Sequence, residues 1–139
     1  MQPIDAILGE LEQEFALFDG WEDRYGYIIE LGRGLEPLPD AARIEKNKVT
    51  GCMSQVWLIT ECDKDHNLHI IADSDAFIVR GLIAILLRLY NDRPARQLLS
   101  FDAGSALASL GLDRHLSPNR RSGFVAMVER IKICAAACA

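Results

Sequence analysis

The sequence predicts an α+β fold in which a small antiparallel sheet is covered by helices, and three observations support this. Apolar residues recur at helical spacing in both the first and the last part of the chain. Between them lie two short β-branched and aliphatic segments, separated by a polar turn. Strands joined by a short turn pair antiparallel, whereas parallel strands need a crossover between them. Helices, then strands, then helices is the order typical of an α+β domain.

The amino-terminal part predicts two amphipathic helices. Residues 3–18 place apolar side chains at helical spacing, with Pro3 in the first turn. Asp19, with Glu22 three residues later, has the form of a capping box that opens a second helix, and Gly32 can end that helix. Both helices are expected to contribute to the core.

The middle of the chain predicts a loop and a β-hairpin. Residues 33–50 lose the helical periodicity and contain prolines and charged residues, which is typical of a loop. Residues 56–60 and 68–72 then predict two strands joined by the polar turn at 63–67. The segment just before Cys52 can supply a third strand.

The remaining segments predict helices. Residues 76–90 are apolar nearly all round, which indicates a central buried helix, with Ser74 as its N-cap and Asp75 beside the positive end of its dipole. Shorter helices are expected over 94–100 and 103–110. The only stripe of the central helix that can face water or a partner has a spacing of four: Arg80, Ala84 and Arg88.

The last helix has a clear start signal. Ser117 is a good N-cap and Pro118 suits the first helical position, so a helix is expected from there to about Cys138.

Length and charge exclude several functional classes. The chain has 139 residues, which fits one domain over residues 1–139. Its net charge of −5 disfavours nucleic acid and anionic membranes as partners. The amino terminus lacks the pattern of a secretory signal, and the most apolar segment, 76–90, is too short to span a membrane. A cytoplasmic protein is therefore expected.

Four cysteines are expected to be thiols: Cys52, Cys62, Cys134 and Cys138. Cys134 and Cys138 continue an apolar stripe of the last helix and are interpreted as small buried hydrophobes. Cys62 ends a strand beside charged residues and can reach solvent. No spacing typical of a metal site is present.

Cys52 differs from the other cysteines because it lies where a polar loop meets a strand. Gly51 permits a positive φ, and Ser54 and Gln55 place hydrogen-bonding groups beside the sulfur. This context indicates a thiol presented for chemistry, although local sequence leaves an incidental loop cysteine equally open. A stand-alone cysteine enzyme would need a base, and His115 is the only histidine in a suitable polar segment. A thiol that exchanges sulfur with another protein needs no base of its own.

Five motifs extend the argument beyond Cys52. They are WEDRYGYIIELG at 21–32, GCMSQVW at 51–57, DSDA at 73–76, IVRGLIA at 78–84 and HLSPNR at 115–120. In their order and spacing they resemble the SufE family of sulfur acceptors for cysteine desulfurases, over about residues 15 to 130. The resemblance implies a two-layer α+β fold with an antiparallel three-stranded sheet, shared with NifU-type iron–sulfur scaffolds.

The resemblance also implies a function and a site. Cys52 would take sulfane sulfur from the persulfide of a desulfurase and pass it to iron–sulfur cluster assembly, as an accessory protein that stimulates the desulfurase. Asp75 matches an aspartate that holds the cysteine loop, Arg120 matches an arginine near the loop and the partner surface, and Gly51 and Gln55 belong to the loop motif.

The expected partners follow from the same resemblance. They are a cysteine desulfurase, which carries the pyridoxal phosphate, and a downstream cluster-assembly scaffold; no cofactor or metal is expected on this chain, which would be a monomer or weak homodimer. Arg121 replaces the family's usual small residue, which leaves open which arginine faces the Cys52 loop. The alternative function is an iron–sulfur cluster scaffold of the NifU type. Cys52 is expected to be sheltered in the free protein and to move outward when the desulfurase docks.

Overall fold

The apolar periodicity of the amino-terminal part produces the two expected helices. In the computed structural model of the protein, which describes residues 2–139, α1 covers Ile4–Ala16 and α2 covers Trp21–Gly32. The N-cap of α2 is Gly20, and no side chain caps it. The predicted capping box of Asp19 and Glu22 is therefore wrong, because the helix begins one residue later than that box requires.

The predicted hairpin is confirmed, but the third strand lies elsewhere. Strand β1 (Val56–Cys62) pairs antiparallel with β2 (Asn67–Ser74), and β3 (Arg93–Pro94) pairs with the other edge of β2. The segment before Cys52 does not form a strand and makes a single bridge, from Lys48 to Trp57. Short 3₁₀ turns, η1 (Asp40–Ala42) and η2 (Glu45–Asn47), occupy that loop and leave too few extended residues to continue the sheet.

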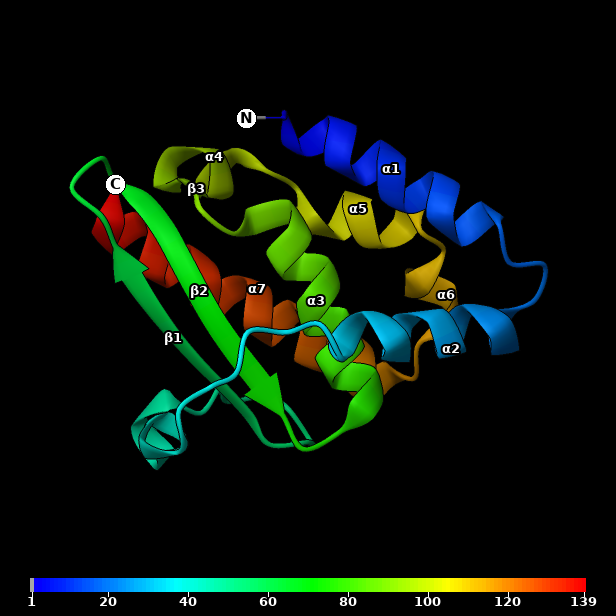
Figure 1. Cartoon of the computed structure of the whole chain (residues 1–139), viewed down its shortest axis with the longest axis horizontal. Coiled ribbons are helices and arrows are strands. Elements are labelled where there is room, and N and C mark those ends of the chain that lie inside the picture. Colours follow the sequence, from blue (N-terminus) through cyan, green and yellow to red (C-terminus); the bar gives the residue numbers. More distant parts are fainter. Residues whose placement is uncertain (1) are drawn as a thin grey trace.

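The sheet is covered by the central and the last helix. Helix α3 (Phe77–Tyr90) contacts β2 and α7 and also packs against α1 and α2, and α7 (Pro118–Cys138) contacts β2. Figure 1 shows α7 passing behind the two long strands while α3 occupies the centre of the molecule. Three short helices connect them: α4 (Ala95–Ser100), α5 (Ala103–Ser109) and α6 (Leu112–His115), of which α6 was not expected. The α+β class with a three-stranded antiparallel sheet is confirmed.

The starts of the two long helices differ in how well the sequence predicts them. Ser117 caps α7 as expected, since its side chain accepts a hydrogen bond from the Arg120 backbone N–H. Ser74 is not the N-cap of α3, because β2 continues through it and the cap is Ala76. The Ser74 hydroxyl instead accepts a hydrogen bond from the Ala76 N–H at 3.2 Å, which shapes the turn between strand and helix.

Helices α2 and α3 approach each other so closely that a side chain is excluded at one position. A Cβ atom placed on Gly81 would lie 2.1 Å from the Ile28 carbonyl oxygen and 2.4 Å from the Ile28 side chain. Gly81 is buried in α3, and Ile28 of α2 is fully buried. The glycine therefore sets how closely the two helices pack, and with it the position of the helix that follows β2.

The expectation that all four cysteines are thiols is wrong for two of them. Cys62 and Cys138 form a disulfide that joins the end of β1 to the end of α7, and Cys52 and Cys134 are free. Figure 1 shows the carboxyl terminus beside the turn of the hairpin, which brings together residues 76 positions apart. Cys138 is buried as predicted, at 5% exposure, whereas Cys134, predicted to be buried as well, is half-buried.

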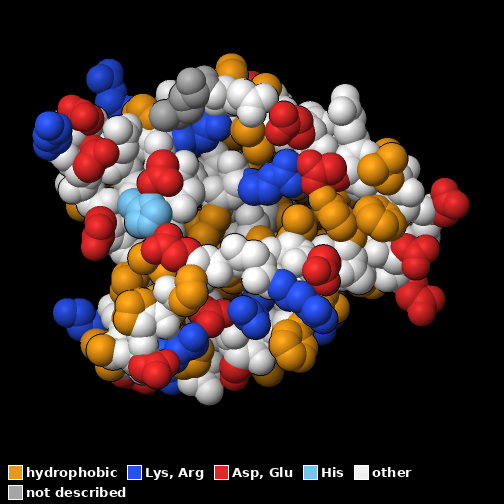
Figure 2. All heavy atoms as spheres, viewed as in Figure 1, with side chains coloured by type: hydrophobic (Ala, Val, Ile, Leu, Met, Phe, Trp, Pro, Cys, Tyr) orange, Lys and Arg blue, Asp and Glu red, His pale blue; other side chains and the backbone are white. Residues whose placement is uncertain are grey.

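The stripe predicted to face water or a partner is largely paired within the chain. Arg80 lies 2.9 Å from Asp73, and Arg88 makes two hydrogen bonds of 2.7 Å to the Glu14 carboxylate. Arg88 and Glu14 thereby connect α3 to α1, and the Tyr27 hydroxyl of α2 donates to the same carboxylate. On the face seen in Figure 2, basic and acidic side chains are intermixed and do not form a field of one sign.

We expect the Glu14–Arg88 pair to make stability depend on pH. The hydrogen bond from Arg88 holds the pKa of Glu14 below its ordinary value of 4.5. The stabilisation is therefore present above that value and is lost as the pH falls through the lower folded-state pKa. Glu14→Gln should reduce the free energy of unfolding by about 1 kcal/mol at pH 7, a small value because the ion pair is partly exposed to solvent. In strong acid, where Glu14 is protonated, the same substitution should change the free energy of unfolding by almost nothing. Urea unfolding at both pH values measures this, with Glu12→Gln, at an exposed position of α1, as the control. An equal loss at both pH values would contradict it.

Candidate functional site

Gly51 turns the chain so that Cys52 faces the last helix. Its φ of 92° lies in the left-handed region, where other residues are strained, and a Cβ atom there would lie 3.3 Å from the Ala126 side chain. The Cys52 sulfur lies 3.6 Å from the Gly123 carbonyl oxygen of α7, to which a thiol can donate. Cys52 is half-buried. The thiol is thus neither free in solvent nor locked inside the core.

A cavity of about 360 Å³ opens beside the sulfur. Three parts of the chain build it, which are the Cys52 loop, helix α3 and the start of α7. The apolar wall includes Val79, Leu82 and Phe124, and Arg120 and Asn119 supply polar groups. Cys52 itself lines this space, so its side chain borders an open volume and not only packed core.

The start of α7 decides which of the two neighbouring arginines belongs to this cavity. Arg120 lines it, whereas the Arg121 guanidinium donates to the Asp113 carbonyl at 2.9 Å, away from it. Within residues 2–139, no carboxylate pairs with Arg120. An exposed guanidinium at the cavity can contact an anion.

Burial controls the ionisation of the Cys52 thiol. It raises the pKa of Cys52 above the ordinary value for a thiol, because a thiolate is poorly solvated there. Arg120 is exposed to solvent and does not reverse this direction. Cys52 is therefore mostly protonated, and weakly nucleophilic, in the free chain at neutral pH.

Asp75 contacts the carboxyl-terminal end of the Cys52 loop through Gln55. Its two carboxylate oxygens accept hydrogen bonds from the Gln55 backbone N–H, at 3.0 Å, and side-chain amide, at 3.4 Å. The Asp75 N–H donates in return to the Gln55 carbonyl at 3.3 Å. Three hydrogen bonds thus fix the last residue of the loop to the segment that leads into α3.

The amino-terminal end of the loop is fixed by a residue that sequence reasoning missed. The Arg130 guanidinium of α7 donates to the backbone carbonyls of Lys48, at 3.1 Å, and Lys46, at 3.2 Å. The Val49 N–H also donates to the Val56 carbonyl at 2.9 Å. No sequence signal marks Arg130, because its acceptors are backbone groups of residues more than 80 positions earlier.

His115 does not serve the cysteine. Its ring stacks on that of Trp21, with centroids 4.0 Å apart, and its carbonyl accepts a hydrogen bond from the Tyr25 hydroxyl. It is not among the residues that line the Cys52 cavity. A stand-alone cysteine enzyme would require a base beside the sulfur. The geometry therefore disfavours that function.

Metal and membrane sites have no support in the part of the chain that the structure describes. Among residues 2–139, no three His, Cys, Asp or Glu side chains are grouped as metal ligands would be. Over the same residues, no helix has the length and apolar character that crossing a bilayer demands.

The sequence model of the Fe-S metabolism associated domain, SufE, matches residues 9–135. The chain belongs to the SufE family. The expected family is thereby confirmed, and with it an association with iron–sulfur metabolism.

Relatives support the SufE assignment over most of the chain. A SufE-like protein of Rhizobium etli, described as uncharacterized, is 44% identical over 130 residues, which cover 91% of this chain and 88% of the relative. Another SufE-like protein, from Rhizobium meliloti and also described as uncharacterized, is 43% identical over 128 residues, which cover 90% of this chain and 91% of the relative.

A solved structure supports the fold of the chain but says nothing about its function. The solution structure of a hypothetical protein from Thermus thermophilus superposes with a TM-score of 0.78 over 99% of this chain and 98% of the other. The sequences are 17% identical, so the likeness concerns the arrangement of helices and strands.

Proposed function

We propose that this protein accepts sulfane sulfur on Cys52 from a pyridoxal-phosphate-dependent cysteine desulfurase, stimulates that enzyme and relays the sulfur to iron–sulfur cluster assembly. The observation that carries the proposal is the setting of Cys52, a free and half-sheltered thiol beside a cavity with an unpaired arginine. Membership in a family of iron–sulfur metabolism supports it. The reaction would take place in the cytoplasm, the location that the sequence predicts.

The proposed sulfur transfer exchanges one S–S bond for another and therefore needs no added oxidant. The Cys52 thiolate attacks the terminal sulfur of the donor persulfide and forms a new S–S bond, while the donor S–S bond breaks and its cysteine leaves as a thiolate. The proton of Cys52 is lost before the attack. A downstream thiolate repeats the exchange on the Cys52 persulfide and regenerates the Cys52 thiolate.

The surroundings of Cys52 support the proposal that the thiol becomes reactive only when the partner enzyme is bound. With its pKa raised by burial, the thiol reacts slowly in the free chain and becomes reactive when docking moves it outward. Met53, which lines the Cys52 cavity, is 80% exposed. Together with Arg120 it offers an apolar contact and a cation to the desulfurase, whose own site supplies the cofactor and the base.

The direct test mixes the protein with a cysteine desulfurase and free cysteine. We expect faster alanine release than with the desulfurase alone, and a mass increase of one sulfur atom on the peptide that contains Cys52. Reduction of the mixture should remove that sulfur. Unchanged alanine release with no sulfur on Cys52 would overturn the proposal.

We expect Asp75 to control access to Cys52. Asp75→Ala removes the two hydrogen bonds that its carboxylate accepts from Gln55, which should loosen the end of the loop at a cost of about 1 kcal/mol. Alkylation of Cys52 should then become several-fold faster at fixed pH. Peptide mass spectrometry after a short exposure to iodoacetamide measures this.

Asp65→Ala, in the exposed turn of the hairpin, is the matched control and should leave the alkylation rate of Cys52 unchanged. A rate in Asp75→Ala equal to that of the wild type would separate Asp75 from the loop.

The alternative function, an iron–sulfur scaffold, would need three or four converging ligands. Cys62 and Cys138 are joined to each other, and Cys134 does not line the Cys52 cavity. No observation favours the scaffold over the sulfur acceptor.

A further inference from the structure

Arg93 is a buried cation that pairs with no carboxylate of residues 2–139. It begins β3, its exposure is 5%, and its Nη1 makes one hydrogen bond, of 3.4 Å, to the Gln97 side-chain oxygen. Within the described residues no carboxylate lies within ion-pair distance of it. A buried guanidinium has lost much of its hydration, so an anion or several acceptors ordinarily compensate it. One long hydrogen bond to a neutral amide does not.

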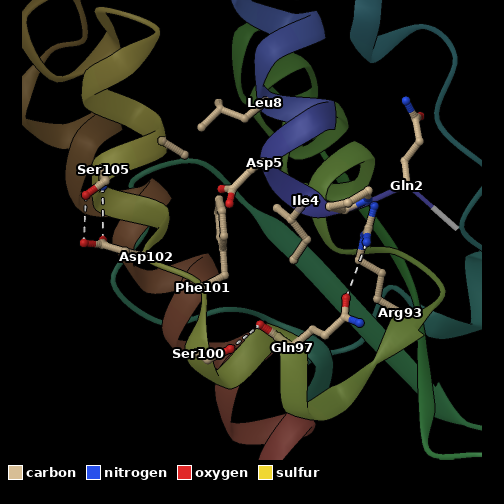
Figure 3. A pocket seen from close by; sticks show the side chains of 12 residues that line it. Gln2, Ile4, Asp5, Leu8, Arg93, Gln97, Ser100, Phe101, Asp102 and Ser105 are labelled. Atoms are coloured by element: carbon tan, nitrogen blue, oxygen red, sulfur yellow. Dashed lines mark hydrogen bonds between the residues drawn. The ribbon is translucent and has the colours of Figure 1, made fainter.

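The side chain of Arg93 lines a cavity of about 590 Å³ that shares no residue with the Cys52 cavity. The start of α1, the segment from β3 through α4, and α5 surround it. Figure 3 shows Arg93 and Gln97 together on one side, with Asp102 and Ser105 on the opposite side. The volume lies in the range of small-molecule sites.

A second positive element borders the same cavity. Pro3 and Ile4, at the amino-terminal end of α1, line it, and among residues 2–139 no side chain caps this 13-residue helix. Asp5, in the first turn of α1, offsets part of the positive end of the helix dipole, and the remainder faces the cavity that Arg93 lines. Buried cation and helix terminus together provide a setting for an anion.

The rest of the lining restricts what that anion can be. Asp5 and Asp102 also border the cavity, and hydrogen bonds from Ser105 hold the pKa of Asp102 below its ordinary value. Two carboxylates oppose a ligand with two negative charges, such as phosphate at neutral pH. Ile4, Leu8 and Phe101 supply an apolar wall. The cavity thus favours a singly charged anion with an apolar part.

We propose that this cavity binds a small organic carboxylate, with the carboxylate on Arg93 and the amino-terminal end of α1 and the apolar part against Ile4, Leu8 and Phe101. A guanidinium matches a carboxylate through paired hydrogen bonds. The inference is independent of the sulfur-transfer function, because it uses none of the residues around Cys52.

The test uses propionate as the probe and the full chain as the protein. Propionate replaces chloride at constant ionic strength while backbone amide signals are followed by NMR. We expect saturable shifts that centre on Ile4 and Gln97 and spare the Cys52 loop. Inorganic phosphate, titrated in the same way, should bind the site more weakly than propionate.

Two substitutions distinguish binding of propionate in the cavity from nonspecific effects of the added salt. Arg93→Met should weaken propionate binding at least about tenfold, since a charge-assisted pair is lost. Arg96→Met, at an exposed position of α4 that does not line the cavity, should bind as the wild type does. If Arg93→Met does not fold, Arg93→Lys keeps the charge but loses the planar fork, and should weaken binding by a smaller factor.

Three results would overturn the proposal. They are the absence of saturable shifts in the wild type, equal propionate affinity in the Arg93 variant and the wild type, and tighter binding of phosphate than of propionate at the same signals.

Discussion

Replacing Cys52 by serine is expected to abolish both sulfur loading and stimulation of a cysteine desulfurase. The sulfur is the only atom of the cavity that can form the S–S bond, and a serine hydroxyl is neither ionised at neutral pH nor stable as a sulfur carrier. Sulfur loading at residue 52 should fall at least about a hundredfold, and alanine release should return to the rate of the desulfurase alone. Alanine release and the mass of the peptide that contains residue 52 measure the two effects.

Cys134→Ser is the matched control, because Cys134 is the second free thiol and does not line the Cys52 cavity. It should load sulfur and stimulate the enzyme as the wild type does. The Cys52→Ser protein should keep its fold, since serine is smaller than cysteine and the site is half-buried. Full stimulation by a folded Cys52→Ser protein would show that sulfur passes elsewhere.

Gly81→Ala is expected to cause a large loss of stability although it adds a single methyl group. The added Cβ would lie 2.1 Å from the Ile28 carbonyl, so α2 and α3 must separate or bend. Both helices are packed in the core, and the cost should be at least about 3 kcal/mol. Urea unfolding followed by circular dichroism measures it.

Gly26→Ala tests the same change where space is open. Gly26 lies within α2, and nothing lies within 4 Å of a Cβ atom placed there. Alanine should stabilise that helix by about 0.5 to 1 kcal/mol, because it has a higher helix propensity than glycine. Similar unfolding free energies for the two variants would mean that the contact at Gly81 does not limit the packing of α2 and α3.

The fold was predictable where one short segment contains the whole signal. Residues 76–90 are apolar on nearly every side and form the central α3, and the two β-branched segments around 63–67 form the hairpin. The third strand was misplaced because β3 has two residues, and its pairing with β2 depends on the path of the chain after α3. The Cys62–Cys138 disulfide depends equally on tertiary structure, because it joins residues 76 positions apart.

The sequence was enough to predict the reactive cysteine of the candidate site, but only some of the residues around it. The loop context and the motif at 51–57 singled out Cys52, and the structure places Arg120 at its cavity. The contact of Asp75 with Gln55 matches the role the resemblance implies, which stays a prediction. Gly123, whose carbonyl lies near the sulfur, could not be found from local pattern, because a glycine within a helix carries no signal of what approaches it.

The fixed ends of the cysteine loop limit how far the sulfur can travel. Val49 and Gln55 are held by hydrogen bonds, and Cys52 lies midway, three residues from each. An extended chain spans about 3.3 to 3.6 Å per residue, so Cys52 can reach about 10 Å from either anchor and no farther. Under the proposed function, the donor enzyme needs either a long arm that carries its persulfide or a close approach to the cavity, because the anchored segment that holds Cys52 is short.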